Sequence, residues 1–193
     1  MSYIEYWDQI FKENKDMNSL ITSYWHDYSN MGMWQFWLVI SLLVLPLILL
    51  YFTVDRRRIF EVFFFGYTVH ILWAYLDIVL QRYSFFVHTY FFTPIFPHAL
   101  NMTASALPVG FLLLYQYCLN HKKNFLVYTL FLSAVFAFGF ATIEALIGML
   151  EFNKGMNQFY LFLIDVGITY AAYFSTKFVK KMRRNEPLDE YHE

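Results

Sequence analysis

Five long runs of apolar residues, separated by short polar segments, dominate the pattern along the chain. They cover approximately residues 33–54, 59–80, 99–119, 125–150 and 158–178. Each run holds about 20 residues or more, and at about 1.5 Å per residue a helix of that length crosses roughly 30 Å of hydrocarbon. The pattern therefore predicts an all-α, polytopic membrane bundle with about five transmembrane helices.

The segments between and within these runs carry residues that end or bend helices. The first run stops at the charged segment 55–58, and the aromatic segment 81–98 contains Pro94 and Pro97, which disfavour a continuous helix. Pro108 lies inside the third run and predicts a kink there.

Residues 1–32 form a polar segment that is rich in aromatic residues and predicts an amphipathic helix. Its larger apolar residues recur every three or four positions, with an interruption at Asn14. They are Tyr3, Trp7, Ile10, Met17, Ile21 and Tyr24. Such a helix either lies in the membrane interface with its aromatic side chains inserted, or packs on the extramembrane loops of its own chain.

Composition agrees with the membrane class. Of the 193 residues, 59% are hydrophobic and only 15% are charged, against roughly 25% charged in soluble domains. The net charge of −1 gives no reason to expect nucleic-acid binding. We expect three parts: an interfacial segment at 1–32, a five-helix domain at 33–178 and a charged cytoplasmic tail at 179–193.

The distribution of lysine and arginine predicts the orientation. Ten basic residues fall on one side of the predicted topology and four on the other. The ten are Arg56, Arg57, Arg58, Lys122, Lys123, Lys177, Lys180, Lys181, Arg183 and Arg184, and the four are Lys12, Lys15, Arg82 and Lys154. Because cytoplasmic segments carry the excess, the N-terminus is expected outside and the C-terminus in the cytoplasm.

Ionisable residues inside the apolar runs are the candidates for chemistry, because placing them in hydrocarbon is costly. Glu61 is expected to pair with Arg57 one turn away. His70, Asp77, Glu144 and Asp165 fall near the midplane or in the predicted outer half. With Trp73, which lies between His70 and Asp77 in the sequence, they form the predicted ligand-binding set.

We expect this set to surround a polar pocket that opens outward, with His70 at its deepest point. The alternative is that the buried carboxyl groups are neutral and hydrogen-bond to neighbouring helices, which would make them structural. No catalytic motif, phosphate loop or cofactor motif is present, and no metal site is expected; His88 and His98 do not have a metal-ligand spacing.

Three parts of the sequence resemble an uncharacterised family of short multi-pass membrane proteins from endospore-forming Gram-positive bacteria. They are the segment Trp73-Ala74-Tyr75-Leu76-Asp77, the proline and aromatic segment Tyr90–Pro97, and Glu144. The resemblance covers about residues 33–178. It implies a protein of the cell membrane in a sporulating organism and brings no known activity.

Three functions remain open at this stage. The protein binds a small molecule, a lipid or an ion in the outward-facing pocket; or it is an intramembrane acid–base enzyme acting on a lipid or isoprenoid; or it is a non-catalytic subunit of a membrane complex. The expected partners are the lipid bilayer, a small apolar or lipid ligand and another membrane protein, and no nucleic acid.

Overall fold

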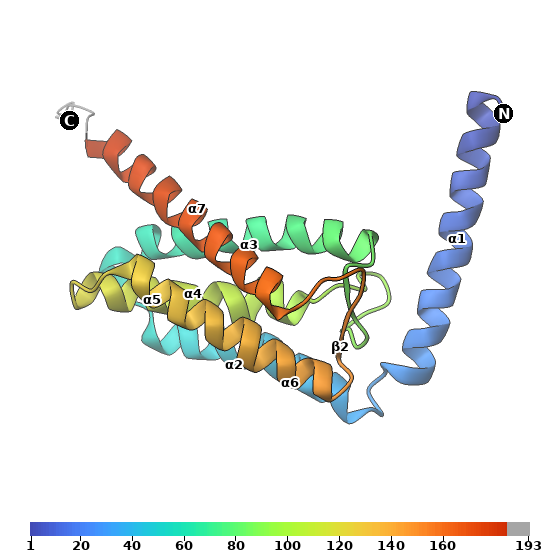
Figure 1. Cartoon of the computed structure of the whole chain (residues 1–193), viewed down its shortest axis with the longest axis horizontal. Helices are drawn as coiled ribbons and strands as arrows, with labels where there is room; N and C mark the ends of the chain where they lie inside the picture. The colour runs from blue at the N-terminus through green and yellow to red at the C-terminus, as the bar shows by residue number, and fades with distance from the viewer. Residues whose placement is uncertain (185–193) are drawn as a thin grey trace, which may run out of the picture.

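The computed structural model describes residues 1–184, and these residues are almost entirely helical (Figure 1). Five helical segments of the described chain are long and apolar enough to cross a membrane. They cover Trp34–Thr53, Arg56–Arg82, Met102–Asn120, Phe125–Leu146 and Gln158–Met182. The predicted all-α bundle of five membrane helices with an additional N-terminal helix is therefore confirmed.

The five spans differ in regularity. The first and fifth spans are single helices, α2 (Trp34–Thr53) and α7 (Gln158–Arg184). The second joins the short 3₁₀ turn η1 (Arg56–Arg58) to α3 (Ile59–Arg82), and the third joins the π-helical turn η2 (Met102–Ala106) to α4 (Leu107–Asn120). The fourth consists of α5 (Phe125–Ala134), the π-helical turn η3 (Val135–Phe140) and α6 (Ala141–Leu146). The irregular turn η2 ends just before Pro108, which has no N–H to donate into the helix. The bend that the sequence predicted at this proline is therefore placed one turn earlier.

Two helix ends differ from the approximate bounds of the predicted spans. The fourth span ends at Leu146 rather than near residue 150, because the chain turns at Gly148, whose φ of +74° suits glycine. The fifth helix continues past residue 178 to Arg184, so the first part of the predicted tail is helical. Residues 185–193 of that tail lie outside the described residues.

A two-stranded ribbon closes one end of the bundle, and the sequence pattern did not predict it. Strand β1 (Phe86–His88) pairs antiparallel with β2 (Leu150–Phe152), so that Phe86 lies opposite Phe152 and His88 opposite Leu150. The ribbon ties the loop after α3 to the loop after α6, at the end of the bundle shown on the right of Figure 1.

Helix α3 is central to the bundle and packs mainly on α4 and α7. Its buried side chains recur every three or four residues, as expected for one helix face, and are Val62, Phe65, Gly66, Val69, Trp73 and Asp77. At Gly66 an added Cβ would lie 2.5 Å from Leu112 Cδ1, so this glycine allows α3 and α4 to approach closely.

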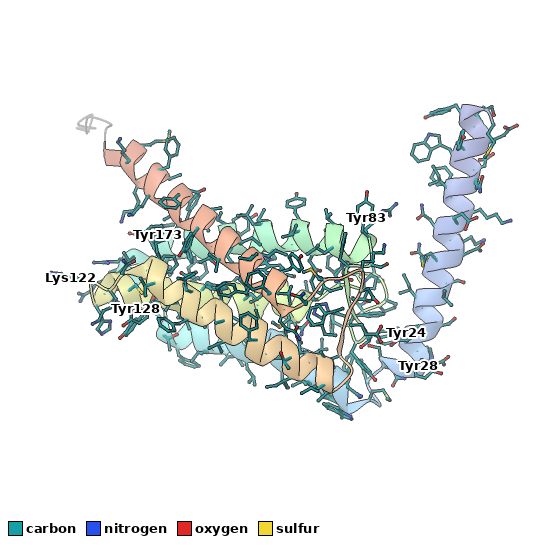
Figure 2. The ribbon with its side chains drawn as sticks, in the orientation of Figure 1. Tyr24, Tyr28, Tyr83, Lys122, Tyr128 and Tyr173 are labelled. Carbon is teal, nitrogen blue, oxygen red and sulfur yellow. The ribbon has the colours of Figure 1, made fainter. Side chains whose placement is uncertain are left out.

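Labelled side chains identify the two ends of the bundle. Figure 2 shows Lys122 at one end and Tyr83 at the other, with Tyr24 and Tyr28 near the Tyr83 end. Helix α1 (Tyr3–Tyr28) stands beside that second end and runs crosswise to the long axis of the bundle (Figure 1).

Candidate functional site

Three carboxyl groups from three different helices line one cavity inside the bundle. Asp77 comes from α3, Glu144 from α6 and Asp165 from α7. Trp73 and Thr103 also line it. The cavity has a volume of ≈ 40 Å³, which is space for only a few water molecules at about 10–15 Å³ each.

The local geometry explains why these side chains converge. Trp73 and Asp77 are four residues apart and therefore share one face of α3. Glu144 follows the π-helical turn η3, and Ala137 and Ala141 on the same span also line the cavity. Their small side chains leave room for the carboxyl group between the helices.

Asp165 is held by the indole of Trp73. Trp73 Nε1 donates to Asp165 Oδ1 at 3.0 Å, and the two side chains are 3% and 2% exposed. This bond links α3 to α7 at the wall of the cavity. Because both partners are out of contact with solvent, the bond is not exchanged with water.

Asp77 connects the cavity to the loop at the end of the bundle. Gln81 Nε2 donates to Asp77 Oδ2 at 2.9 Å, and His98 Nδ1 lies 3.7 Å from the same oxygen. The second oxygen, Asp77 Oδ1, is buried and has no hydrogen-bond partner among the described residues. The side chain of His98 is 21% exposed, so it lies between Asp77 and the surface.

Glu144 is the least compensated of the three carboxyl groups. The side chain is 4% exposed, and its Oε1 makes no hydrogen bond to any part of the described chain. No lysine or arginine lines the cavity. Burying a carboxylate without a positive or hydrogen-bonding partner is costly, so this arrangement requires a proton, water or a cation at the cavity.

His70 does not occupy the position that the sequence predicted. It is not among the residues that line the cavity, and its Nδ1 lies 2.7 Å from the backbone oxygen of Thr103. The backbone at the π-helical turn η2 therefore takes up the ring nitrogen that was expected to face the carboxyl groups. The structure thus brings together Trp73, Asp77, Glu144 and Asp165 and leaves His70 outside.

Two apolar side chains of the ribbon also line the cavity. Phe86 of β1 and Leu150 of β2 are both 3% exposed, so the ribbon packs against the cavity at this end of the bundle. The outward opening of the pocket stays a prediction. His88 of the same ribbon is buried, and this burial, together with the nearby His98, lowers its pKa to about 4. Burial likewise lowers the pKa of His98 below its usual value.

Glu61 lies at the opposite end of α3 and belongs to a separate cluster. It accepts hydrogen bonds from Tyr115 Oη at 2.7 Å and Lys180 Nζ at 2.6 Å. The predicted pairing with Arg57 is wrong, because Arg57 lies in the 3₁₀ turn η1 and α7 supplies the cation instead. A surface groove of ≈ 860 Å³ lies beside this cluster, between α3 and α7, and four of its eight lining side chains are aromatic.

Within the described residues, no group of three or more histidine, cysteine, aspartate or glutamate side chains is placed to hold a metal ion. The three carboxyl groups therefore line one cavity without converging on a single coordination point.

Two residues at the site, Gln81 and Thr103, were not predicted from the sequence. Gln81 lies four residues after Asp77, and this spacing could have identified it as a hydrogen-bond partner on the same helix face. Thr103 carried no comparable signal, because its position depends on the π-helical turn η2.

Comparison with known proteins adds no relative to this description. No family model matches the chain, and neither a curated protein nor a solved structure matches it. The resemblance to membrane proteins of endospore formers therefore stays a prediction from the sequence. The fold shows a membrane protein with five helices able to span the bilayer.

Proposed function

We propose that this membrane protein binds protons at the cavity formed by Asp77, Glu144 and Asp165. The observation that carries the proposal is the unpartnered, buried Glu144 beside two further carboxyl groups, without a basic side chain at the cavity. Protons neutralise such a cluster within a volume of ≈ 40 Å³, and a few water molecules complete its hydrogen bonds.

The size of the cavity supports a proton over the larger ligands that the sequence left open. Sites for small organic ligands usually have volumes of about 300–1,000 Å³, and the carboxyl cavity has ≈ 40 Å³. A lipid tail or an isoprenoid does not fit this space. The same limit disfavours the intramembrane enzyme, because its substrate would have to reach these carboxyl groups.

In this proposal, protons exchange between the cavity and the nearer bundle end through Asp77 and His98. His98 is partly exposed and lies 3.7 Å from Asp77 Oδ2, while Asp77 itself lines the cavity. A neutral imidazole can accept a proton on one nitrogen and donate from the other, which suits this intermediate position.

We further propose that this end faces the outside of the cell membrane. The support is the ten-to-four excess of lysine and arginine on the opposite side. A reporter attached to the C-terminus should remain inaccessible in intact cells and become accessible after permeabilisation. Labelling of that reporter in intact cells would reverse the orientation.

Infrared difference spectroscopy of the full-length protein in lipid nanodiscs tests proton binding. Titration across about pH 4 to 9, a range that includes ordinary and displaced carboxyl values, should change the carbonyl-stretch band of protonated carboxylic acids. Glu144→Gln and Asp165→Asn should each remove part of that change. Glu61→Gln is the matched control, because Glu61 already has a cation and a hydroxyl as partners.

A titration in which no protonated-carboxyl band changes would refute the proposal. The same conclusion follows if Glu144→Gln and Asp165→Asn leave the band as it is in the unmodified chain. Circular dichroism of each variant establishes that the helical fold is retained.

A second candidate function, lipid binding, is favoured by the groove between α3 and α7. Its volume of ≈ 860 Å³ and its aromatic lining suit an acyl chain, and Lys180 lies at its edge beside Glu61. Native mass spectrometry should detect a retained phospholipid that Phe64→Trp displaces by filling the groove. Phe52→Trp on exposed α2 is the control, since Phe52 does not line the groove.

A further inference from the structure

Helix α1 carries an apolar stripe, interrupted at Asn14, that the described chain leaves largely uncovered. None of the residues from Tyr3 to Tyr28 is fully buried. Tyr3, Ile10, Met17 and Tyr24 follow one another at intervals of seven residues, which is nearly two helical turns, so they lie on one face. Tyr3 is 78% exposed and Met17 is 56% exposed.

The last turns of α1 are fixed to the end of the bundle. Tyr24 Oη donates to the backbone oxygen of Thr89 at 2.9 Å, and Trp25 Nε1 donates to that of Phe91 at 3.2 Å. Ser29 Oγ both donates to Phe91 O at 3.1 Å and accepts from Phe91 N at 3.0 Å. Helix α1 is therefore attached in a defined direction.

The same attachment shows which way the stripe faces. Tyr24 belongs to the stripe and stacks on Phe91 with ring centroids 6.1 Å apart. The face of α1 that touches the bundle is thus the face that carries Tyr3, Ile10 and Met17. Because helical residues seven apart stay on one side, the uncovered part of the stripe points toward the same side as the bundle.

The direction of α1 places this stripe along the surface of the bilayer. The membrane-spanning helices run along the long axis of the bundle, and α1 runs crosswise to that axis beside its end (Figure 1). A helix of 26 residues extends over about 39 Å. An uncovered apolar face over this length needs a covering, because packing of the apolar face supplies most of the stability of a helix.

We propose that α1 lies in the lipid interface of the leaflet at the ribbon end of the bundle, with the Tyr3, Trp7, Ile10, Met17 and Ile21 side chains inserted among the lipids. Tyrosine and tryptophan suit this depth, because their rings combine an apolar body with a polar group that stays hydrated. The stripe continues the contact that Tyr24 and Trp25 make with the bundle, so protein and lipid cover one continuous face.

Charge indicates the kind of lipid surface. Helix α1 contains five acidic residues, Glu5, Asp8, Glu13, Asp16 and Asp27, against two lysines, Lys12 and Lys15. A polar face with this excess of negative charge is not attracted to anionic headgroups. Insertion of the apolar stripe therefore has to supply the binding, and phosphatidylcholine vesicles are a sufficient surface.

Spin labelling of the full chain in phosphatidylcholine vesicles tests the proposal. In a Cys118→Ser background, single cysteines replace Ile10, Met17 and Ile21 on the stripe. Asp8, Lys12 and Ser19 on the opposite face are the matched controls. All six positions are at least partly exposed, so the labels do not displace a buried side chain.

The expected result is a several-fold higher ratio of oxygen to aqueous nickel accessibility at the three stripe positions than at the three control positions. High nickel accessibility at all six positions would show α1 in water and overturn the proposal. Exclusion of both reagents from the stripe would show a protein covering, such as a second copy of the chain, and would overturn it as well. Neither result bears on the proton-binding cavity.

Discussion

The hydrogen bond between Trp73 and Asp165 offers a direct test of how the cavity is held together. Trp73→Phe removes the donor and Asp165→Ala removes the acceptor, while the double variant removes both. Each single change also alters packing, so only the coupling energy of the double-mutant cycle reports the bond.

The structure sets the expected magnitude. The donor and acceptor are 3.0 Å apart and almost completely buried. Hydrogen bonds between membrane helices contribute about 0.6 kcal/mol on average and up to about 1.7 kcal/mol. Because both partners are buried, we expect a coupling of about 1 kcal/mol, which is roughly a fivefold change in the unfolding constant.

The measurement is equilibrium unfolding in mixed micelles with a rising fraction of sodium dodecyl sulfate, followed by circular dichroism. Trp73→Phe combined with Glu61→Gln is the control cycle. These residues are twelve positions apart on α3, about 18 Å, so their effects should add. A coupling below about 0.3 kcal/mol in the Trp73–Asp165 cycle would refute the assigned contribution of this bond.

Three further predictions concern the packing and the ribbon end of the bundle. Gly66→Ala should destabilise the fold by about 1–3 kcal/mol, because its Cβ would meet Leu112 Cδ1 at 2.5 Å. The same change should cost less in a Leu112→Ala background, measured in the same unfolding assay, and an equal cost in both backgrounds would contradict this packing. Because burial lowers the pKa of His88 to about 4, the unfolded state takes up a proton before the folded state as the pH falls. The folded state should therefore lose stability as the pH falls from about 6.5 to 4, by at most about 3 kcal/mol. His88→Phe should flatten the dependence of the thermal midpoint on pH. Equal slopes of the thermal midpoint against pH for both proteins would argue against this role of His88. Ser29→Ala removes the acceptor for Phe91 N and one of the two donors to Phe91 O, the other being Trp25 Nε1. This loss should weaken the attachment of α1 by about 1–3 kcal/mol and speed proteolysis between α1 and α2; an unchanged cleavage rate would count against this role.

The candidate site shows what the spacing of residues along one helix can predict and what it cannot. Trp73 and Asp77 could be placed on one face of α3 from their separation alone, and the structure confirms that placement. The same argument put His70 on that face, but its ring turns to the backbone of Thr103. The spacing of residues determines on which side of a helix a side chain lies, whereas the packing of neighbouring segments determines which group that side chain contacts.

One wall of the cavity depends on a contact between distant segments. Phe86 lies in the loop before the third span and Leu150 in the loop after the fourth, and they meet because β1 and β2 pair. Strands of three residues carry too little alternation for a sequence pattern to register. The sequence therefore did not indicate that these two loops would line the cavity together.

The sequence by itself determined the class of protein, the number of spans and the amphipathic N-terminal helix. These features depend on local hydrophobicity, since a run of about 20 apolar residues and a regular apolar spacing act through neighbouring positions alone. The tertiary structure decided that α3, α6 and α7 bring three carboxyl groups to one cavity, that Lys180 rather than Arg57 pairs with Glu61, and that α1 turns its stripe toward the side of the bundle. Those arrangements depend on helix packing and strand pairing between residues far apart in the chain, which one-dimensional spacing does not encode.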